Sequence, residues 1–149
     1  MTTSAFDGNI ASEIVAQFDA RPEMLVQILN EFVKRFGYIP EDAIRQLGSE
    51  LNLSRADVHG VVSYYHDFRT AKPGKHVVKL CQAEACQAMG SRELSTHARN
   101  ALGDDVTVEP VYCLGNCALS PAIMVDGKTY GRVSAERFDE IIGGLGEGE

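Results

Sequence analysis

Residues 76–86 read HVVKLCQAEAC and residues 106–117 read VTVEPVYCLGNC, so two apolar segments each run directly into a pair of cysteines. The valine-rich segments predict two strands, and the cysteines mark the places where the strands end. Loops that follow neighbouring strands can lie side by side, so we expect the four thiols to face one point. These candidate ligands, spaced C-x4-C and then C-x3-C, are Cys81, Cys86, Cys113 and Cys117.

The rest of this half reads as alternating helices and short strands. The stretch between the two cysteine pairs predicts one helix, 86–102. An Asp-Gly dipeptide separates the strand-like segments 122–125 and 129–133, which is a strong signal for a β-hairpin. Ser134 is a suitable N-cap for a last helix. We expect an α/β fold in which the strand with Pro110 lies at a sheet edge.

The first half of the chain carries apolar residues at helical spacing instead. Pro22 can begin the second helix and Gly37 can end it, 41–51 predicts the third, and Ser54 with Asp57 predicts the start of the fourth. The apolar stripe of the second helix comprises Leu25, Ile28, Leu29, Phe32, Val33 and Phe36. The buried face predicted for the fourth comprises Val58, Val61, Val62, Tyr65 and Phe68.

The two halves meet at a short stretch with turn chemistry, AKPGK at 71–75. We therefore predict an α+β protein with two domains. An N-terminal helical bundle spans 1–70, and an α/β domain with the four cysteines spans 71–149.

Composition narrows the classes of function. The 149 residues include 14 Lys and Arg against 21 Asp and Glu, a net charge of −7. This balance argues against nucleic acid and against an anionic membrane surface as partners. The chain lacks both a bilayer-length apolar run and an N-terminal leader signature, so we expect a cytoplasmic protein without membrane insertion. Structural disulfides are rare in that compartment, so four cysteines favour metal binding or redox work.

The cysteine spacing by itself leaves two kinds of metal site open. A [2Fe–2S] cluster and a structural zinc ion both accept four thiolates, and zinc ribbons favour closer pairs than these. A thioredoxin-type disulfide needs C-x2-C, and a Rieske centre needs two histidines in the ligand set, which His76 and His97 do not match. Gly90 and Gly115 allow backbone to approach sulfur, so we expect N–H groups to donate hydrogen bonds to the thiolates.

Three stretches of the sequence resemble those of a known protein family. Residues 113–122 (CLGNCALSPA) resemble the second cluster loop of the thioredoxin-like [2Fe–2S] ferredoxin subunits, such as the small flavin-side subunit of complex I. Residues 36–43 (FGYIPEDA) and 53–65 (LSRADVHGVVSYY) are similar to that family's two N-terminal signatures. The resemblance extends over about 28–142. One departure is Ser120, where an alanine is common, and we expect it to alter hydrogen bonding in the loop more than ligation.

The resemblance implies a cofactor, ligands and partners. The implied cofactor is one [2Fe–2S] cluster in a thioredoxin-like domain. The implied partner is a larger subunit that binds FMN and NAD and that connects this chain to a catalytic dehydrogenase subunit. In this family the chain passes single electrons, and we find no catalytic residue on it. The ligands that match, residue by residue, are Cys81, Cys86, Cys113 and Cys117.

A finer resemblance concerns the parent complex. Residues 65–69 (YHDFR) and 81–90 (CQAEACQAMG) look most like the gamma chain of NAD-dependent formate dehydrogenase, which uses molybdenum or tungsten. The same subunit of complex I or of an NAD-linked hydrogenase is the first alternative. A zinc-stabilised protein-binding module and a free-standing ferredoxin are alternatives from other classes.

Overall fold

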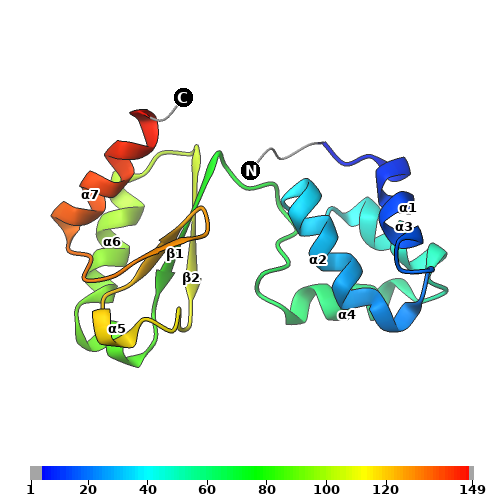
Figure 1. The fold of residues 1–149 in the computed structure, drawn as a ribbon, viewed down its shortest axis with the longest axis horizontal. Coiled ribbons are helices and arrows are strands. Elements are labelled where there is room, and N and C mark those ends of the chain that lie inside the picture. Colours follow the sequence, from blue (N-terminus) through cyan, green and yellow to red (C-terminus); the bar gives the residue numbers. More distant parts are fainter. Residues whose placement is uncertain (1–4, 148–149) are drawn as a thin grey trace. The chain divides into compact units, whose positions relative to one another are not determined.

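The computed structural model describes residues 5–147, so residues 1–4, where a leader would begin, and residues 148–149 lie outside the described residues. The chain divides into two compact units, Met1–Lys72 and Pro73–Glu149. The described part of the first unit is helical, and the second combines helices with a sheet (Figure 1). Within residues 5–147, no helix is both long and apolar enough to cross a membrane.

Over residues 5–72, the first unit consists of four α-helices and one 3-10 turn. Pro22 begins a 3-10 turn and the second α-helix follows at Leu25, three residues later than predicted, whereas Gly37 ends that helix as predicted, in a left-handed conformation with φ of 81°. In chain order the elements are α1 (Gly8–Ala16), η1 (Pro22–Met24), α2 (Leu25–Phe36), α3 (Glu41–Glu50) and α4 (Arg55–Tyr64).

The predicted apolar stripe of α2 forms the centre of this unit. Ile28, Leu29, Phe32 and Phe36 are fully buried there, and the rings of Phe32 and Phe36 lie 5.6 Å apart. Burial of four such side chains removes a large apolar area from water, which is the main stabilising contribution to a helical unit of this size. The neighbouring helices contribute Ala11, Ile14, Val15, Ala43, Ile44, Leu47, Val58 and Val62 to the same core.

The start of α4 is as predicted and its end is not. Ser54 and Asp57 form a reciprocal capping box, in which each side chain accepts from the other residue's backbone N–H. The helix ends at Tyr64, and Tyr65 is extended, with φ of −90° and ψ of 118°. The helical register therefore does not carry Tyr65 inward, and its side chain is 43% exposed, whereas Phe68 is buried.

The second unit alternates strands and helices around one sheet. Its helices α6 and α7 lie together on one face of the sheet (Figure 1). In chain order the elements are β1 (His76–Cys81), α5 (Glu84–Ala88), α6 (Ser91–Ala101), β2 (Val106–Val111), η2 (Cys117–Leu119), β3 (Ile123–Val125), β4 (Lys128–Tyr130), α7 (Ala135–Gly143) and η3 (Gly144–Glu147).

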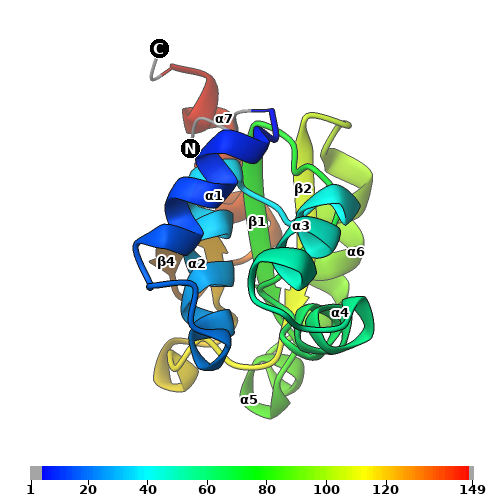
Figure 2. The same cartoon turned by 90° about the vertical axis from the view of Figure 1, so that its right-hand side faces the viewer.

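The sheet has the strand order β2-β1-β3-β4. β1 and β2 are parallel neighbours, with Cys81 opposite Val111, and they lie side by side in Figure 2. β3 and β4 form the predicted antiparallel hairpin. β2 is an edge strand, so Pro110 lies where its missing N–H costs no internal ladder bond, as predicted.

Two predicted elements differ from the observed ones. The helix predicted over 86–102 is broken into α5 and α6 by Gly90, whose φ of 93° a helix does not allow. The last strand ends at Tyr130 instead of 133, because Arg132 adopts a φ of 51° and donates its N–H to the Leu119 carbonyl over 2.6 Å. That bond ties the end of the hairpin to the second cysteine loop.

The core of this unit lies between the sheet and its two long helices. Val78 and Leu80 of β1 pack with Leu94 of α6 and Phe138 of α7. Ser134 caps α7 as predicted, accepting from the N–H of Arg137 over 3.2 Å. The helices and the sheet thus form a rigid base, and the loops at the ends of β1 and β2 carry the cysteines.

Candidate metal centre

The parallel pairing of β1 and β2 decides where the cysteines lie. Cys81 is the last residue of β1, and Cys113 follows β2 after one intervening residue. Parallel neighbours end at the same edge of a sheet, so the two cysteine loops lie next to each other there. Cys86 lies in the short helix α5 and Cys117 begins η2, so each loop folds back toward its own strand end.

The sulfurs are arranged as two pairs. The Sγ atoms of Cys113 and Cys117 lie 3.8 Å apart. Two sulfurs bound at about 2.3 Å to one tetrahedral metal are also about 3.8 Å apart, so this pair has the spacing of ligands to a single metal atom. Cys81 and Cys86 form the second pair and are buried together in one small cluster with Ala122. The charges of this second pair also act on Cys117, so the pairs are neighbours.

The two pairs differ in their access to solvent. Cys81 and Cys86 are only 3% and 2% exposed, packed with Ala122. Cys113 and Cys117 are exposed. A group held by all four thiols would therefore be anchored on its inner side by the buried pair and reach the protein surface at the outer pair.

Burial and neighbouring thiols act on the pKa values in the site. Burial raises the pKa of the Cys81 thiol, although backbone groups of Ala83 and Leu114 hydrogen-bond its sulfur and oppose the rise. The pKa of Cys117 is raised by its hydrogen bond with Cys113 and by the like charge that both thiolates would carry. Such a site resists four free thiolates and favours a bound cation or cationic core that neutralises them.

Cys86 behaves differently because a serine contacts it. Burial alone would raise the pKa of Cys86, but the neighbouring Ser120 side chain and Ala122 backbone bring it below its ordinary value. The Cys86 sulfur lies 3.6 Å from Ser120 Oγ, and the Ser120 hydroxyl donates to the Cys117 carbonyl over 2.7 Å. The sequence flagged Ser120 as a departure from the family, but its contact with Cys86 depends on the fold.

Gly90 and Gly115 were both predicted to let backbone N–H groups approach a cysteine sulfur, and the prediction is confirmed at Gly115. The N–H of Gly115 donates to Cys113 Sγ over 3.3 Å. Cys113 itself has a φ of 117°, which is unusual for a residue other than glycine, and this conformation makes the tight turn. Gly90 instead follows α5 and permits the change of direction into α6, so its role is to redirect the backbone between the two helices.

The donor set fits a group with two metal atoms. Among residues 5–147, no three His, Cys, Asp or Glu side chains gather closely enough to hold one metal ion. Two separate pairs of thiols, one of them at the 3.8 Å spacing of single-metal ligands, fit a two-iron core better than one zinc ion surrounded by four sulfurs. His76 and His97 are engaged elsewhere, with Asp126 at 2.6 Å and Asp139 at 2.7 Å respectively.

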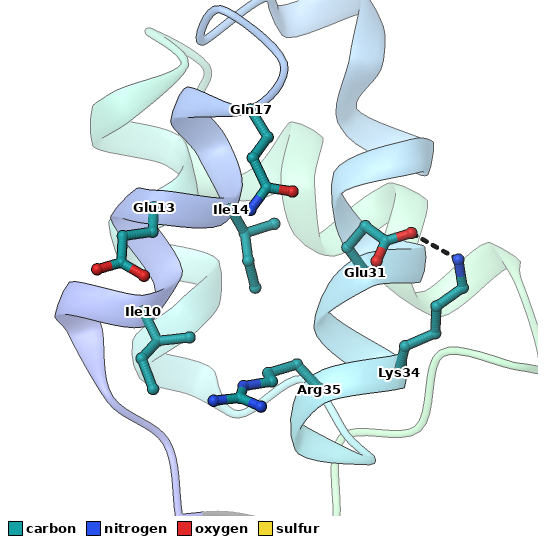
Figure 3. Close-up of a pocket in the computed structure, with 7 residues that line it drawn as sticks. All are labelled: Ile10, Glu13, Ile14, Gln17, Glu31, Lys34 and Arg35. Atoms are coloured by element: carbon teal, nitrogen blue, oxygen red, sulfur yellow. Dashed lines mark hydrogen bonds and ion pairs between the residues drawn. The ribbon is translucent and has the colours of Figure 1, made fainter.

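Two grooves on the surface of the described residues were compared with the position of the cysteines. One, with a volume of about 350 Å³, lies between α1 and α2 of the helical unit (Figure 3) and contains neither thiol nor imidazole. It is lined by Ile10, Glu13, Ile14, Gln17, Glu31, Lys34 and Arg35. The other, of about 500 Å³, runs beside the second cysteine loop, where Ala118, Ser120 and Pro121 face Met89 and Arg132.

The chain belongs to the thioredoxin-like [2Fe–2S] ferredoxin family, whose model matches residues 11–146. Its cofactor is accordingly a [2Fe–2S] cluster, as predicted. The match covers the helical unit as well as the thioredoxin-like one.

Individual relatives are components of larger oxidoreductases. The chain is 30% identical over 126 residues to a subunit of the NADH-quinone oxidoreductase of Pseudomonas aeruginosa, covering 78% of this chain and 76% of that protein. It is 28% identical over 142 residues to the HndA subunit of the NADP-reducing hydrogenase of Solidesulfovibrio fructosivorans, covering 87% and 83%. A solved NAD+-reducing [NiFe]-hydrogenase shares the fold, with a TM-score of 0.71 at 19% identity, over 87% of this chain and 23% of the hydrogenase chain.

Proposed function

We propose that this chain is a non-catalytic electron-transfer subunit whose four cysteines hold its [2Fe–2S] cluster. The observation that carries the proposal is the meeting of two thiol pairs at the ends of β1 and β2, one pair with the 3.8 Å spacing of ligands to one metal. The thiolates of Cys81, Cys86, Cys113 and Cys117 are the proposed ligands.

The chemistry of the site follows from this assignment. When bound, a [2Fe–2S] cluster takes up and releases one electron at a time, whereas flavins and nicotinamides also handle electron pairs. The buried pair, Cys81 and Cys86, fixes the ligand loops against the core. The Gly115 N–H directs positive charge at Cys113, which offsets part of the charge that the sulfurs carry.

We propose that the partner docks over the exposed cysteine pair. Three of the large apolar side chains exposed in the described chain lie close in sequence to a cysteine, namely Met89, Tyr112 and Leu119. Aromatic residues and methionine are enriched at protein interfaces. The partner is a subunit that binds FMN and NAD, and through it a catalytic dehydrogenase subunit. The names of the relatives, which are subunits of NADH- and NADP-linked enzymes, support this.

For the parent complex we propose NAD-dependent formate dehydrogenase, with this chain as its gamma subunit. The support is the resemblance of residues 65–69 and 81–90 to that chain. The second candidate is the equivalent subunit of complex I or of a hydrogenase, which the names of the relatives favour. Activity of the purified complex with formate, with quinone or with hydrogen separates the candidates.

We further propose two domains, a helical bundle at 1–70 and the thioredoxin-like domain at 71–149, in a cytoplasmic protein. The division into compact units supports the first part. Four free cysteines fit a reducing compartment, which supports the second.

Co-purification tests the proposed assembly. The tagged full-length chain, produced in its own host, should carry a protein with bound FMN through gel filtration, and NADH should reduce both. Replacing Tyr112 and Leu119 together with Ser should release that protein while the chain keeps its iron. The matched control replaces the exposed Tyr64 of α4. A chain that elutes alone, with its cluster intact, would contradict the proposed partner.

A further inference from the structure

Ser120 contacts a member of each cysteine pair. Its side chain is only 9% exposed. The hydroxyl donates to the carbonyl of Cys117 over 2.7 Å, and the oxygen accepts a hydrogen bond from the Cys86 thiol at 3.6 Å. One hydroxyl group therefore links the buried pair to the exposed pair.

This hydrogen-bond pattern suits a protonated Cys86 and not a ligand. A hydroxyl has one hydrogen to donate and two lone pairs that accept. A metal-bound cysteine is a thiolate, which has no proton to donate. With Cys86 as a ligand, a lone pair of Ser120 would face lone pairs on sulfur, which is repulsive. Rotation about the Cβ–Oγ bond removes the repulsion by turning the hydroxyl hydrogen from the Cys117 carbonyl to the sulfur, with the heavy atoms in place.

We propose that Ser120 donates its hydroxyl hydrogen to the Cys86 sulfur in the cluster-loaded protein and thereby raises the reduction potential of the cluster. The inference rests on the proposed function, because it requires Cys86 as a ligand. Reduction adds one electron, which dithionite supplies in the test below, and no covalent bond is made or broken. The added charge spreads onto the ligand sulfurs, so a donor aimed at one sulfur stabilises the reduced form more than the oxidised form.

The surroundings of Ser120 indicate that loss of its hydroxyl changes the reduction potential of the cluster without removing the cluster. Cys86 is itself only 2% exposed and packs with Cys81 and Ala122, so removal of the hydroxyl leaves this cysteine held by its apolar neighbours. The Ser120 side chain belongs to the wall of the groove formed with Met89 and Arg132, so loss of one oxygen there opens no closed cavity. Ser120→Ala is therefore expected to retain the cluster. Ser120 is a positioning residue that acts through Cys86.

The test is a redox titration of the cluster-loaded full chain with dithionite, followed by electron paramagnetic resonance (EPR). Ser120→Ala should lower the equilibrium constant for one-electron reduction about tenfold, a shift of about 59 mV to lower potential. Ser120→Thr, which keeps the hydroxyl, should stay near the wild-type potential. Ser134→Ala also removes a hydroxyl from this unit, but one that caps α7, and should lower stability without moving the potential.

A second measurement identifies the hydrogen itself. Electron–nuclear double resonance of the reduced wild-type protein should show a coupled proton that disappears both in D2O and in Ser120→Ala. If Ser120→Ala does not bind the cluster, Ser120→Cys replaces it in the titration. A thiol is a weaker hydrogen-bond donor than a hydroxyl, so the reduction potential of the Ser120→Cys cluster should lie below that of the wild type.

The outcomes separate this inference from the function on which it rests. An unchanged potential in Ser120→Ala, or in Ser120→Cys where that variant replaces it, with wild-type iron and sulfide, overturns the inference and leaves the proposed function standing. A wild-type chain that binds no iron and sulfide overturns the proposed function first.

Discussion

The Sγ atoms of Cys113 and Cys117 lie 3.8 Å apart at the protein surface, at the spacing of two ligands to one metal atom. The backbone turn between them sets this distance, since the Gly115 N–H already donates to Cys113 over 3.3 Å. The other pair, Cys81 and Cys86, is instead fixed by burial. The site thus combines an exposed pair held by a turn with a buried pair held by the core.

Replacing a cysteine of either pair should cost the chain its iron. Cys117→Ser and Cys86→Ser should each sharply lower the iron bound per chain, because a serine oxygen is a poor substitute for a thiolate ligand of iron. Cys117→Ser should keep its secondary structure, since Cys117 is exposed. His97→Ala, which breaks a contact with Asp139, is the control and should bind iron normally. Full iron content in either cysteine variant would remove that residue from the ligand set.

Gly131 supports the second cysteine loop by having no side chain. A Cβ at this position would lie 2.6 Å from Leu119 Cβ and 2.8 Å from Asn116 Nδ2. Gly131→Ala should therefore displace the loop that carries Cys117, lowering the free energy of unfolding by about 1–3 kcal/mol and speeding iron release. Gly103→Ala is the control, because a Cβ there meets nothing within 4 Å. Chelator-induced bleaching and urea titration measure the two effects, and equal bleaching in both variants would contradict the prediction.

Ser91 is a buried polar residue whose hydroxyl lacks a partner among the described residues. The side chain is 2% exposed at the first position of α6. Removal of an unsatisfied buried hydroxyl relieves its desolvation cost, so Ser91→Ala should raise the free energy of unfolding by about 1 kcal/mol. Urea unfolding measures the change. A loss of stability would show that the hydroxyl has a hydrogen-bond partner.

The capping box of α4 predicts a loss of stability confined to the helical unit. Ser54→Ala should lower the free energy of unfolding by about 1 kcal/mol, because the N–H of Asp57 loses its acceptor. Ser63→Ala is the matched control, since that exposed hydroxyl bonds only the carbonyl one turn back, at Gly60. Hydrogen exchange should report faster opening of α4 in Ser54→Ala, with iron content unchanged. Equal exchange rates in the two variants would count against the capping role.

Much of the fold could be predicted because local signals agreed with it. The stripe of α2, the cap at Ser54 and the hairpin between β3 and β4 are each specified within a few residues. The placement of Cys81 and Cys113 at strand ends followed from the same patterns. These features depend on periodicity and turn chemistry, which a single sequence displays.

The features that escaped prediction depend on contacts between distant residues. The break at Gly90 occurs inside a helix-like stretch, where a lone glycine is also tolerated in a continuous helix. The early end of β4 depends on the bond from Arg132 to Leu119. The contact between Ser120 and Cys86 joins residues 34 positions apart, so spacing could not reveal it.

The most direct test of the account is the quantification of iron, acid-labile sulfide and zinc in the anaerobically purified chain. We predict about two irons and two sulfides per chain, a red-brown colour, and about one unpaired spin per chain after reduction. Colourless protein with one tightly bound zinc and no sulfide would contradict the central claim that the four cysteines hold a [2Fe–2S] cluster.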